Sequence, residues 1–316
     1  MSNFAITGIS GYIGQLLLKR LEKYDDCAKV VGIDIKYPNS ASPKLKFYHS
    51  DIRDKNIGHI FEREKVDTLV HLAFAFQPIH DIKKAYDIDV NGAANVLKNA
   101  AKYGVKRILI FSSTTAYGAH KDNPEFLTEE SPLRGNKDFY YIHDKAEVEK
   151  VSEKFINEFK NIIFMNIRPC IIFGPNVNNH VSRYIDRPLV PFVLGYNPDF
   201  QLVHETDLID ACMIAFEKNI SGSFNIVGKD TVKIKSIPAL GGRKLLEAPF
   251  PLFYFMNELA WQLRIPLVEM PASMSSLVMY RWIASGEKAR KILGFVPKYS
   301  TKEAILDFYQ KRVIKQ

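Results

Sequence analysis

The first half of the chain alternates short apolar runs with segments of helical periodicity. The apolar runs are rich in β-forming residues and read NFAITG, KVVGID, LKFYHSDI, DTLVHLA, RILIFSS and NIIFMNIRPCIIFG. The periodic segments cover roughly Tyr12–Tyr24, Lys55–Glu64, Ile79–Tyr103 and Phe139–Asn157. Near-continuous apolar strands that alternate with helices predict an α/β fold, with a doubly wound parallel sheet covered on both faces. Such sheets bind ligands at the carboxyl ends of their strands.

The pattern changes after Gly174-Pro175. Residues 176–200 have little periodicity, FQLVHETDLIDACMIAFEK reads as a strand followed by a helix, and GSFNIVG reads as another strand. The remainder is mainly helical and interrupted by prolines. We therefore expect an N-terminal domain over residues 1–175, to which 201–228 return, and a smaller substrate-binding lobe over 176–200 and 229–316.

The most apolar stretch of the chain is APFPLFYFM, from Ala248 to Met256. It is shorter than the ~20 residues that a membrane span requires, and it contains two prolines. The stretch predicts a core helix or the wall of a pocket, and a surface that contacts lipid is the alternative. We expect no membrane partner.

Composition narrows the classes of partner. The chain has 43 Lys and Arg against 35 Asp and Glu, a net charge of +8, and these residues are spread along its length. Without a basic stripe this charge does not indicate nucleic-acid binding, but a modest positive field suits an anionic cofactor. The three cysteines are unpatterned and the histidines lack ligand spacing, which predicts a reducing compartment and no metal. Since MSNFAITGISG does not resemble a signal peptide, we expect a cytoplasmic location.

The first strand leads into a glycine turn and a helix. Gly8, Gly11 and Gly14 are spaced G-x-x-G-x-x-G, which permits a tight turn and lets backbone N–H groups approach a pyrophosphate. A strand before the turn and an amphipathic helix after it are typical of a Rossmann-type dinucleotide site. Asp34, 20 residues after Gly14, ends the second strand and could accept hydrogen bonds from the adenosine ribose. A carboxylate there would repel the additional phosphate of NADP, so NAD is the predicted cofactor, although Lys36 close by leaves NADP open.

Further cofactor contacts are expected in the glycine turn and at the ends of the following strands. Asp51 and Ile52 would border the adenine, and small residues after the fourth strand would line the dinucleotide. The full set of these positions is Ser10, Tyr12, Ile13, Asp51, Ile52, Leu72, Ala73, Phe74, Ala75 and Ser112.

Two segments carry candidate chemistry. The fifth strand ends in four hydroxyl residues, S-S-T-T, which could bind a substrate oxygen in front of a nicotinamide. Tyr141 and Lys145 are four residues apart in a predicted helix and therefore share one face. An ammonium beside a phenol favours the phenolate and lowers the pKa of the tyrosine, which makes it a usable proton-transfer group near neutral pH.

These motifs occur in a characteristic order along the chain. The glycine turn, Asp34, S-S-T-T-A-Y-G, Tyr141-x-x-x-Lys145 and Arg168-Pro-x-x-x-x-Gly174-Pro175 together resemble the extended short-chain dehydrogenase/reductase family. Within it they are similar to the NAD-dependent epimerase/dehydratase group, which includes the UDP-glucose 4-epimerases. The resemblance runs from the start of the chain through GSFNIVG and continues more faintly in VHETDLIDA and KARKILGFVPKYSTKEAI.

The resemblance implies roles for individual residues. Tyr141 would be the acid/base, and Lys145 would lower its pKa and hold the nicotinamide ribose. Ser113, with Thr114 as the alternative, would orient the substrate. The resemblance further implies that Asn91 supports the lysine, that Pro169 lies near the carboxamide, and that the helices at about 79–103 and 139–157 pair into a homodimer.

The substrate is less defined. Nucleotide-sugar members of the family usually carry an asparagine three residues after the arginine of the sixth strand, where it contacts the substrate, but this chain has Ile171 there. Arg183, which could face a phosphate, and His204 are further substrate-binding candidates. Three functions stay open: an epimerase acting on a nucleotide sugar such as a UDP-sugar, a dehydrogenase or reductase of a less polar alcohol or ketone similar to steroid dehydrogenases, and an NAD-binding sensor with little catalysis.

Overall fold

The computed structural model describes residues 1–314 and divides into two compact units. Unit 1 comprises residues 1–112, 144–168 and 212–224, and unit 2 comprises residues 113–143, 169–211 and those from 225 onward. The chain therefore passes between the units several times. The two units are defined by which residues pack together. The predicted boundary near residue 175 separates a cofactor-binding domain from a substrate-binding lobe, and it stays a prediction.

Unit 1 is built on a seven-stranded sheet in the order β11-β6-β5-β4-β1-β2-β3. All neighbouring pairs from β6 to β3 are parallel, which confirms the predicted α/β fold with a doubly wound sheet. The strands are β1 (Ser2–Thr7), β2 (Cys27–Asp34), β3 (Leu45–His49), β4 (Thr68–His71), β5 (Arg107–Phe111), β6 (Ile163–Pro169) and β11 (Gly222–Ile226).

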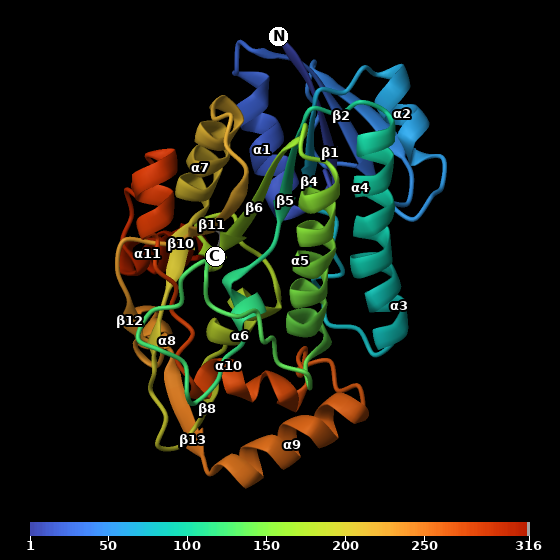
Figure 1. The fold of residues 1–316 in the computed structure, drawn as a ribbon. Coiled ribbons are helices and arrows are strands. Elements are labelled where there is room, and N and C mark those ends of the chain that lie inside the picture. The colour runs from blue at the N-terminus through green and yellow to red at the C-terminus, as the bar shows by residue number, and fades with distance from the viewer. Residues whose placement is uncertain (315–316) are drawn as a thin grey trace. The chain divides into compact units, whose positions relative to one another are not determined.

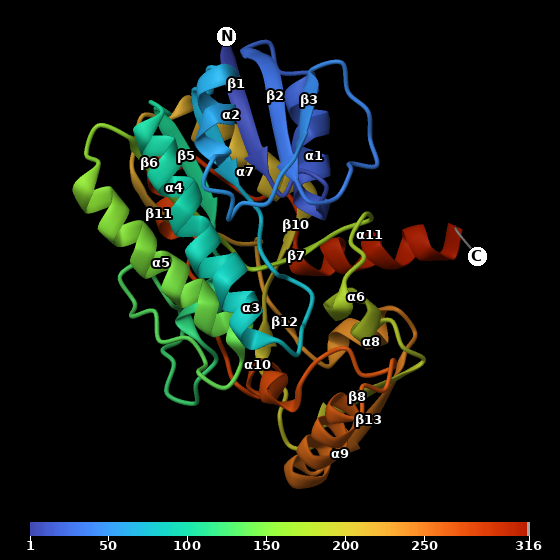
Figure 2. The same ribbon diagram turned by 90° about the vertical axis from the view of Figure 1, so that its right-hand side faces the viewer.

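Helices cover both faces of this sheet (Figure 1). The helices that contribute to unit 1 are α1 (Tyr12–Glu22), α2 (Ile57–Arg63), α3 (Ile82–Tyr86), α4 (Gly92–Lys102), α5 (Tyr140–Glu158) and α7 (Glu205–Glu217). One core cluster joins the strands to α2, α4 and α5, with Phe61, Leu97 and Phe155 among its buried side chains. Figure 2 shows α1 on the opposite face of the strands from α4. On that second face Phe4 of β1 contacts Phe216 of α7, with ring centroids 5.0 Å apart.

Two predicted elements are divided in the structure. The helix expected over Ile79–Tyr103 consists of α3, a π-helical turn at Asp87–Asn91, and α4. The apolar run NIIFMNIRPCIIFG forms two strands, β6 and β7 (Ile171–Phe173), and β7 pairs with β10 (Leu202–His204) outside the large sheet. The apolar pattern of the run does not show this change of sheet, because both strands are apolar.

Unit 2 contains short two-stranded pairings and several helices. β7 pairs with β10 and β8 (Leu189–Val193) with β13 (Lys244–Ala248), both in parallel, and β9 (Asp199–Phe200) pairs antiparallel with β12 (Val232–Lys233). Its remaining helices are α6 (His180–Ile185), α8 (Ser236–Leu240), α9 (Phe250–Gln262), α10 (Ser276–Met279) and α11 (Thr301–Ile314).

Helix α9 corrects one prediction made from the sequence. The stretch Ala248–Met256 was expected to form a core helix or a pocket wall, but no residue of α9 is buried. Phe255 is 62% exposed, and Phe253 contributes to the wall of a cavity in unit 2. The core interpretation is therefore wrong, and the pocket-wall interpretation is confirmed. Among the residues from 1 to 314, no helix is both long and apolar enough to cross a membrane.

Candidate active site

The glycine turn between β1 and α1 has no room for larger residues. Gly8 has a φ of +75°, and a Cβ atom there would lie 2.7 Å from the backbone nitrogen of Ala73. A Cβ at Gly14 would lie 2.6 Å from the carbonyl oxygens of Gly8 and Ile9. The N-cap residue of α1 is Gly11, which has no side chain to cap the helix, and the partial positive charge of a helix N-terminus favours an anion there. This cradle fits the pyrophosphate of a dinucleotide.

Asp34 is connected directly to this turn. Its carboxylate accepts hydrogen bonds from the backbone N–H groups of Ser10 and Lys36, each at 3.0 Å. The Ser10 hydroxyl donates in turn to the Lys36 carbonyl at 2.5 Å. The carboxylate is thereby fixed at the carboxyl end of β2, beside the glycine turn. Its role in binding a ribose stays a prediction.

The ends of β1 and β4 are also joined. The Thr7 hydroxyl and His71 Nδ1 are 2.7 Å apart and both residues are buried. Burial lowers the pKa of His71 to about 3, so this imidazole is neutral near pH 7. Beyond His71, Leu72 and Ala73 approach Gly8, and the Ala75 N–H donates to Asp89 at 2.6 Å. The structure thus brings Leu72 and Ala73 next to the glycine turn, whereas Ala75 is bonded to Asp89.

Lys145 is buried against the end of β5. Its ammonium donates to the Phe111 carbonyl at 2.8 Å and lies 3.6 Å from the ring centroid of Phe74. Burial lowers the pKa of Lys145 to about 8, against the opposing effect of the Asp89 and Glu149 carboxylates. The lysine is therefore held in one orientation and carries a charge that is sensitive to its neighbours.

Asp89 is a residue that sequence reasoning missed. It is fully buried in the π-helical turn, and burial raises the pKa of its carboxyl to about 7, although the charge of Lys145 lowers it. Asn91, the predicted partner of Lys145, is exposed and donates to Asp87 at 3.0 Å. The role predicted for Asn91 stays untested, and the carboxylates that act electrostatically on Lys145 are those of Asp89 and Glu149. An acidic residue in the apolar context Ile-Asp-Val was the available signal.

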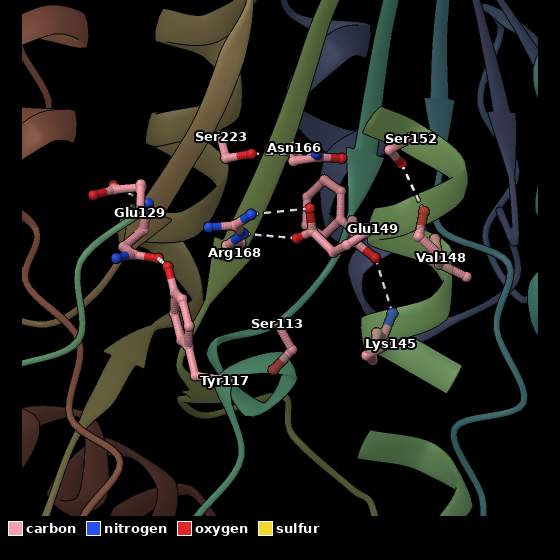
Figure 3. A network of polar contacts seen from close by, with 12 residues as sticks. Ser113, Tyr117, Glu129, Lys145, Val148, Glu149, Ser152, Asn166, Arg168 and Ser223 are labelled. Carbon is pink, nitrogen blue, oxygen red and sulfur yellow. Dashed lines mark hydrogen bonds and ion pairs between the residues drawn. The ribbon is translucent and has the colours of Figure 1, made fainter. Parts of the chain in front are cut away.

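A buried ion pair lies on the helix that carries Lys145. Arg168 of β6 donates to Glu149 of α5 through Nε at 2.7 Å and through Nη2 at 3.1 Å (Figure 3). Both side chains are almost fully buried. On the same helix the Ser152 hydroxyl donates to the Val148 carbonyl at 2.9 Å. The ion pair fixes α5 to β6 within unit 1.

In unit 2, Ser113 is the second of the four hydroxyl residues that follow β5. Its Oγ donates to the Pro169 carbonyl at 3.4 Å and accepts from the Thr115 N–H at 3.1 Å. Thr114 opens a short 3₁₀ turn and is fully buried. Ser112, the first of these four residues, belongs to unit 1. It is buried, and its N–H donates to the Ile167 carbonyl at 2.9 Å. Ser113 is thus the more accessible of the two predicted hydroxyls.

Tyr141 lies in the first turn of α5, one turn before Lys145. It is half-buried, and its ring centroid is 6.0 Å from that of Phe139. The structure confirms the helix on which the Tyr-x-x-x-Lys spacing was placed. The catalytic role of the tyrosine stays a prediction.

The other predicted positions have structural partners. Asp51 accepts from the Arg53 side chain at 2.7 Å and Ile52 is part of the core of unit 1. His204 stacks on Tyr299 with centroids 3.9 Å apart and accepts at Nδ1 from the Thr206 N–H. Their predicted contacts with cofactor or substrate remain predictions.

Two of the substrate-binding candidates differ in their surroundings. Arg183 donates through Nε to both carboxylate oxygens of Glu269 at 2.9 Å, so its charge is already paired. Ile171 lines the apolar cavity of unit 2. Among the described residues, no cluster of three or more His, Cys, Asp or Glu side chains could hold a metal.

Known proteins resemble this chain in sequence and in fold. The model of the NAD dependent epimerase/dehydratase family matches residues 4–227. An uncharacterized protein of Mycobacterium tuberculosis is 25% identical over 314 residues, which cover 97% of this chain and 83% of that protein. The UDP-glucose 4-epimerase of Lacticaseibacillus casei is 25% identical over 342 residues, covering 96% and 94%. The structure of UDP-glucuronic acid 4-epimerase from Bacillus cereus in complex with NAD has a TM-score of 0.76 at 18% identity, covering 99% and 100%, and shows the same fold.

The doubly wound sheet, the glycine cradle and Asp34 define a dinucleotide-binding protein of Rossmann type. The chain belongs to the NAD dependent epimerase/dehydratase family. This membership confirms the predicted family, the enzyme class and NAD as the cofactor.

Proposed function

We propose that the protein is an NAD-dependent enzyme that oxidises a hydroxyl-bearing carbon to a ketone, with Tyr141 as the acid/base. The observation that supports this most strongly is the position of Lys145. It lies one helical turn after Tyr141, buried, with its ammonium fixed on the Phe111 carbonyl. A fixed cation beside a tyrosine favours the phenolate that proton abstraction requires.

Each residue then has a defined task. The Tyr141 phenolate removes the proton of the substrate hydroxyl, and Ser113 donates a hydrogen bond that orients the same oxygen. Bound NAD would supply the acceptor for the hydride that leaves the carbon. The glycine turn, from Gly8 to Gly14, would hold the pyrophosphate, and Asp34 the adenosine ribose. Tyr141 returns the proton when the ketone is reduced again.

Two substrate classes agree with this chemistry. The first is a nucleotide-sugar hydroxyl, for which reduction of the transient ketone from the opposite face gives an epimer, and the UDP-glucose 4-epimerase relatives favour it. The second is a less polar alcohol, for which release of the ketone gives a dehydrogenase. The second is favoured by Ile171, which lines an apolar cavity at a position where nucleotide-sugar members usually carry asparagine.

A first experiment follows the cofactor through extensive dialysis of the purified protein, with mass spectrometry of the denatured supernatant. An epimerase restores its cofactor in each cycle and can retain it, so retained NAD supports the first substrate class. Freely exchanging NAD supports the second. Protein that neither retains nor rebinds NAD would contradict the whole proposal.

The role of Tyr141 is tested by Tyr141→Phe, with Tyr140→Phe on the same helix as the matched control. We expect Tyr141→Phe to abolish turnover and to leave NAD affinity unchanged, because the phenol acts on the substrate proton and not on the dinucleotide. Tyr140→Phe should retain turnover. Near-normal turnover in Tyr141→Phe would refute this assignment. Absence of turnover in the wild type itself would favour the NAD-binding sensor.

A further inference from the structure

Unit 2 contains an apolar cavity of about 100 Å³. Its wall includes Ile171 and Phe173 of β7, Leu202 of β10, Phe253 of α9 and Val278 of α10. A cavity of about 150 Å³ lined by Leu, Ile and Phe stays dry and binds molecules such as benzene. The lining of this cavity therefore suits a hydrocarbon group and not a hydrated one.

The polar side chains at the wall are already bonded within the protein. The Tyr184 hydroxyl donates to the Pro191 carbonyl, and burial raises the pKa of this phenol above its usual value. The Arg187 guanidinium donates to the Leu267 carbonyl and lies 5.1 Å from the ring centroid of Tyr184. A ligand that accepted a hydrogen bond from the Tyr184 hydroxyl would first have to break the bond to Pro191 that the fold has made.

The acidic and amide groups at the wall are engaged in the same way. Glu269 accepts two hydrogen bonds from Arg183 at 2.9 Å, and the Asn257 side chain donates to the Met270 carbonyl at 3.1 Å. A diphosphate requires cations or free N–H donors to offset the loss of its hydration. Glu269 places a carboxylate at the wall, and Arg183, which pairs with it, lies outside the wall. A diphosphate would therefore meet one guanidinium, that of Arg187, beside a negative charge, so the wall suits an uncharged ligand better.

Only a short stretch of chain separates the cavity wall from Ser113, the residue proposed to bind the substrate oxygen. Ser113 bonds the Pro169 carbonyl, and Ile171 follows Pro169 by two residues at the start of β7. Two residues of extended chain span roughly 7 Å. A substrate whose hydroxyl or carbonyl contacts Ser113 could therefore extend an apolar part past Ile171 into the cavity.

We propose that this cavity binds the apolar part of the substrate, a hydrocarbon chain or ring attached to the carbon that is oxidised. That the ligand is the substrate rests on the proposed function, whereas the binding of an apolar ligand by the cavity does not. The cavity thus favours a less polar alcohol or ketone over a nucleotide sugar.

The experiment is a fluorescence titration of the full-length protein, with NAD present, using the apolar probe N-phenyl-1-naphthylamine. We expect saturable binding that decanol displaces and UDP does not. Val278→Phe fills the cavity and should lower the affinity of the protein for the probe by at least tenfold. Val296→Phe, the same change at an exposed position of unit 2, is the matched control and should leave the affinity unchanged.

The control variants keep other outcomes distinct. Circular dichroism and NAD affinity verify that Val278→Phe is folded, and Val181→Phe fills the cavity from α6 if it is not. Full probe affinity in a folded cavity-filling variant would place the probe elsewhere, for example on the exposed side of α9, and would overturn the proposal. Displacement by UDP at concentrations comparable to decanol would also overturn it. Tyr141→Phe should bind the probe with wild-type affinity. Probe binding and turnover therefore test the cavity proposal and the proposed chemistry separately.

Discussion

At the scale of single residues, the charge of Lys145 depends on two buried neighbours, Asp89 and Glu149. The Asp89 carboxylate raises the pKa of Lys145, while burial lowers it to about 8. Asp89→Asn removes the opposing charge, so we predict that the pKa of Lys145 falls below its wild-type value. The lysine would then lose its proton closer to neutral pH. NMR titration of protein labelled with ¹⁵N-lysine measures this shift without any substrate.

Asp87→Asn is the matched control for this prediction. Asp87 lies in the same π-helical turn, but its exposed carboxylate pairs with Arg53 at 2.8 Å. It should leave the titration of Lys145 unchanged. An unchanged or higher pKa of Lys145 in Asp89→Asn would show that the two groups do not interact in the folded protein.

The same residues show where sequence reasoning reaches its limit. The spacing of Tyr141 and Lys145 fixes their common helix face, and that could be predicted because helix geometry is local. Asp89, the partner of Lys145, could not be predicted in this way, because the packing of α4 and its π-helical turn against α5 brings it close. A π-helical turn changes which residues of a helix face inward, and it is found often at functional sites. This explains why Asp89, and not Asn91, lies buried near Lys145.

At the scale of elements, the ion pair between Arg168 and Glu149 connects β6 with α5. Breaking a buried pair by removing one partner typically costs about 3 to 5 kcal/mol, because the other charge is left buried and unpaired. We therefore predict that Glu149→Ala lowers the free energy of unfolding of the protein by roughly that amount. Urea unfolding followed by far-ultraviolet circular dichroism is the measurement.

Glu153→Ala, an exposed position on the same helix, controls for the helix propensity of alanine. It should change stability by no more than about 0.5 kcal/mol. The double variant Glu149→Leu with Arg168→Met leaves no unpaired charge and should be more stable than Glu149→Ala. If Glu149→Ala were as stable as Glu153→Ala, the pair would not be buried in solution.

A second element-scale contact gives a pH dependence. Glu64, at the end of α2, accepts hydrogen bonds from Lys29, Lys46 and Tyr48. Burial alone would raise the pKa of Glu64, but these three groups lower it to about 2. A carboxyl whose folded pKa lies below its unfolded value, near 4.3, stabilises the fold above the unfolded pKa and loses that contribution as pH falls toward the folded pKa.

We therefore predict that the stability of the wild type declines more steeply between about pH 4.5 and pH 2 than that of Glu64→Gln. Thermal unfolding at a series of pH values compares the two slopes. Glu62→Gln, a 65% exposed position on the same helix, should follow the wild type. Identical slopes for the wild type and Glu64→Gln would mean that Glu64 titrates alike in the folded and unfolded chains.

At the scale of the whole molecule, the predicted sheet follows from patterns that are repeated along the chain. The central strands β4, β5 and β6 are buried along nearly their whole length, so their sequences are largely apolar and can be recognised without knowledge of their neighbours. The strands of unit 2 are short, and their pairings, such as β8 with β13, join residues far apart in sequence. Helix α9 is as apolar as a core helix and yet has no buried residue, because burial is decided by what packs on a helix and not by its composition.

Cofactor choice is also a property of the whole folded chain, and it gives the last prediction. A ligand that binds only the folded state stabilises it in proportion to the logarithm of its concentration over its dissociation constant, by about 2.7 kcal/mol at a hundredfold excess. NAD should therefore raise the melting temperature more than NADP at equal concentration, because the Asp34 carboxylate, fixed by the N–H groups of Ser10 and Lys36, repels the additional phosphate.

Asp34→Ala is expected to narrow or reverse this difference, since it removes the repulsion and leaves Lys36 free to attract the phosphate of NADP. Asp25→Asn, an exposed position in unit 1, removes one negative charge of the same kind and should retain the wild-type preference for NAD. Differential scanning fluorimetry with both dinucleotides measures all three proteins. Equal shifts by NAD and NADP in the wild type would mean that the Asp34 carboxylate does not discriminate between the two dinucleotides.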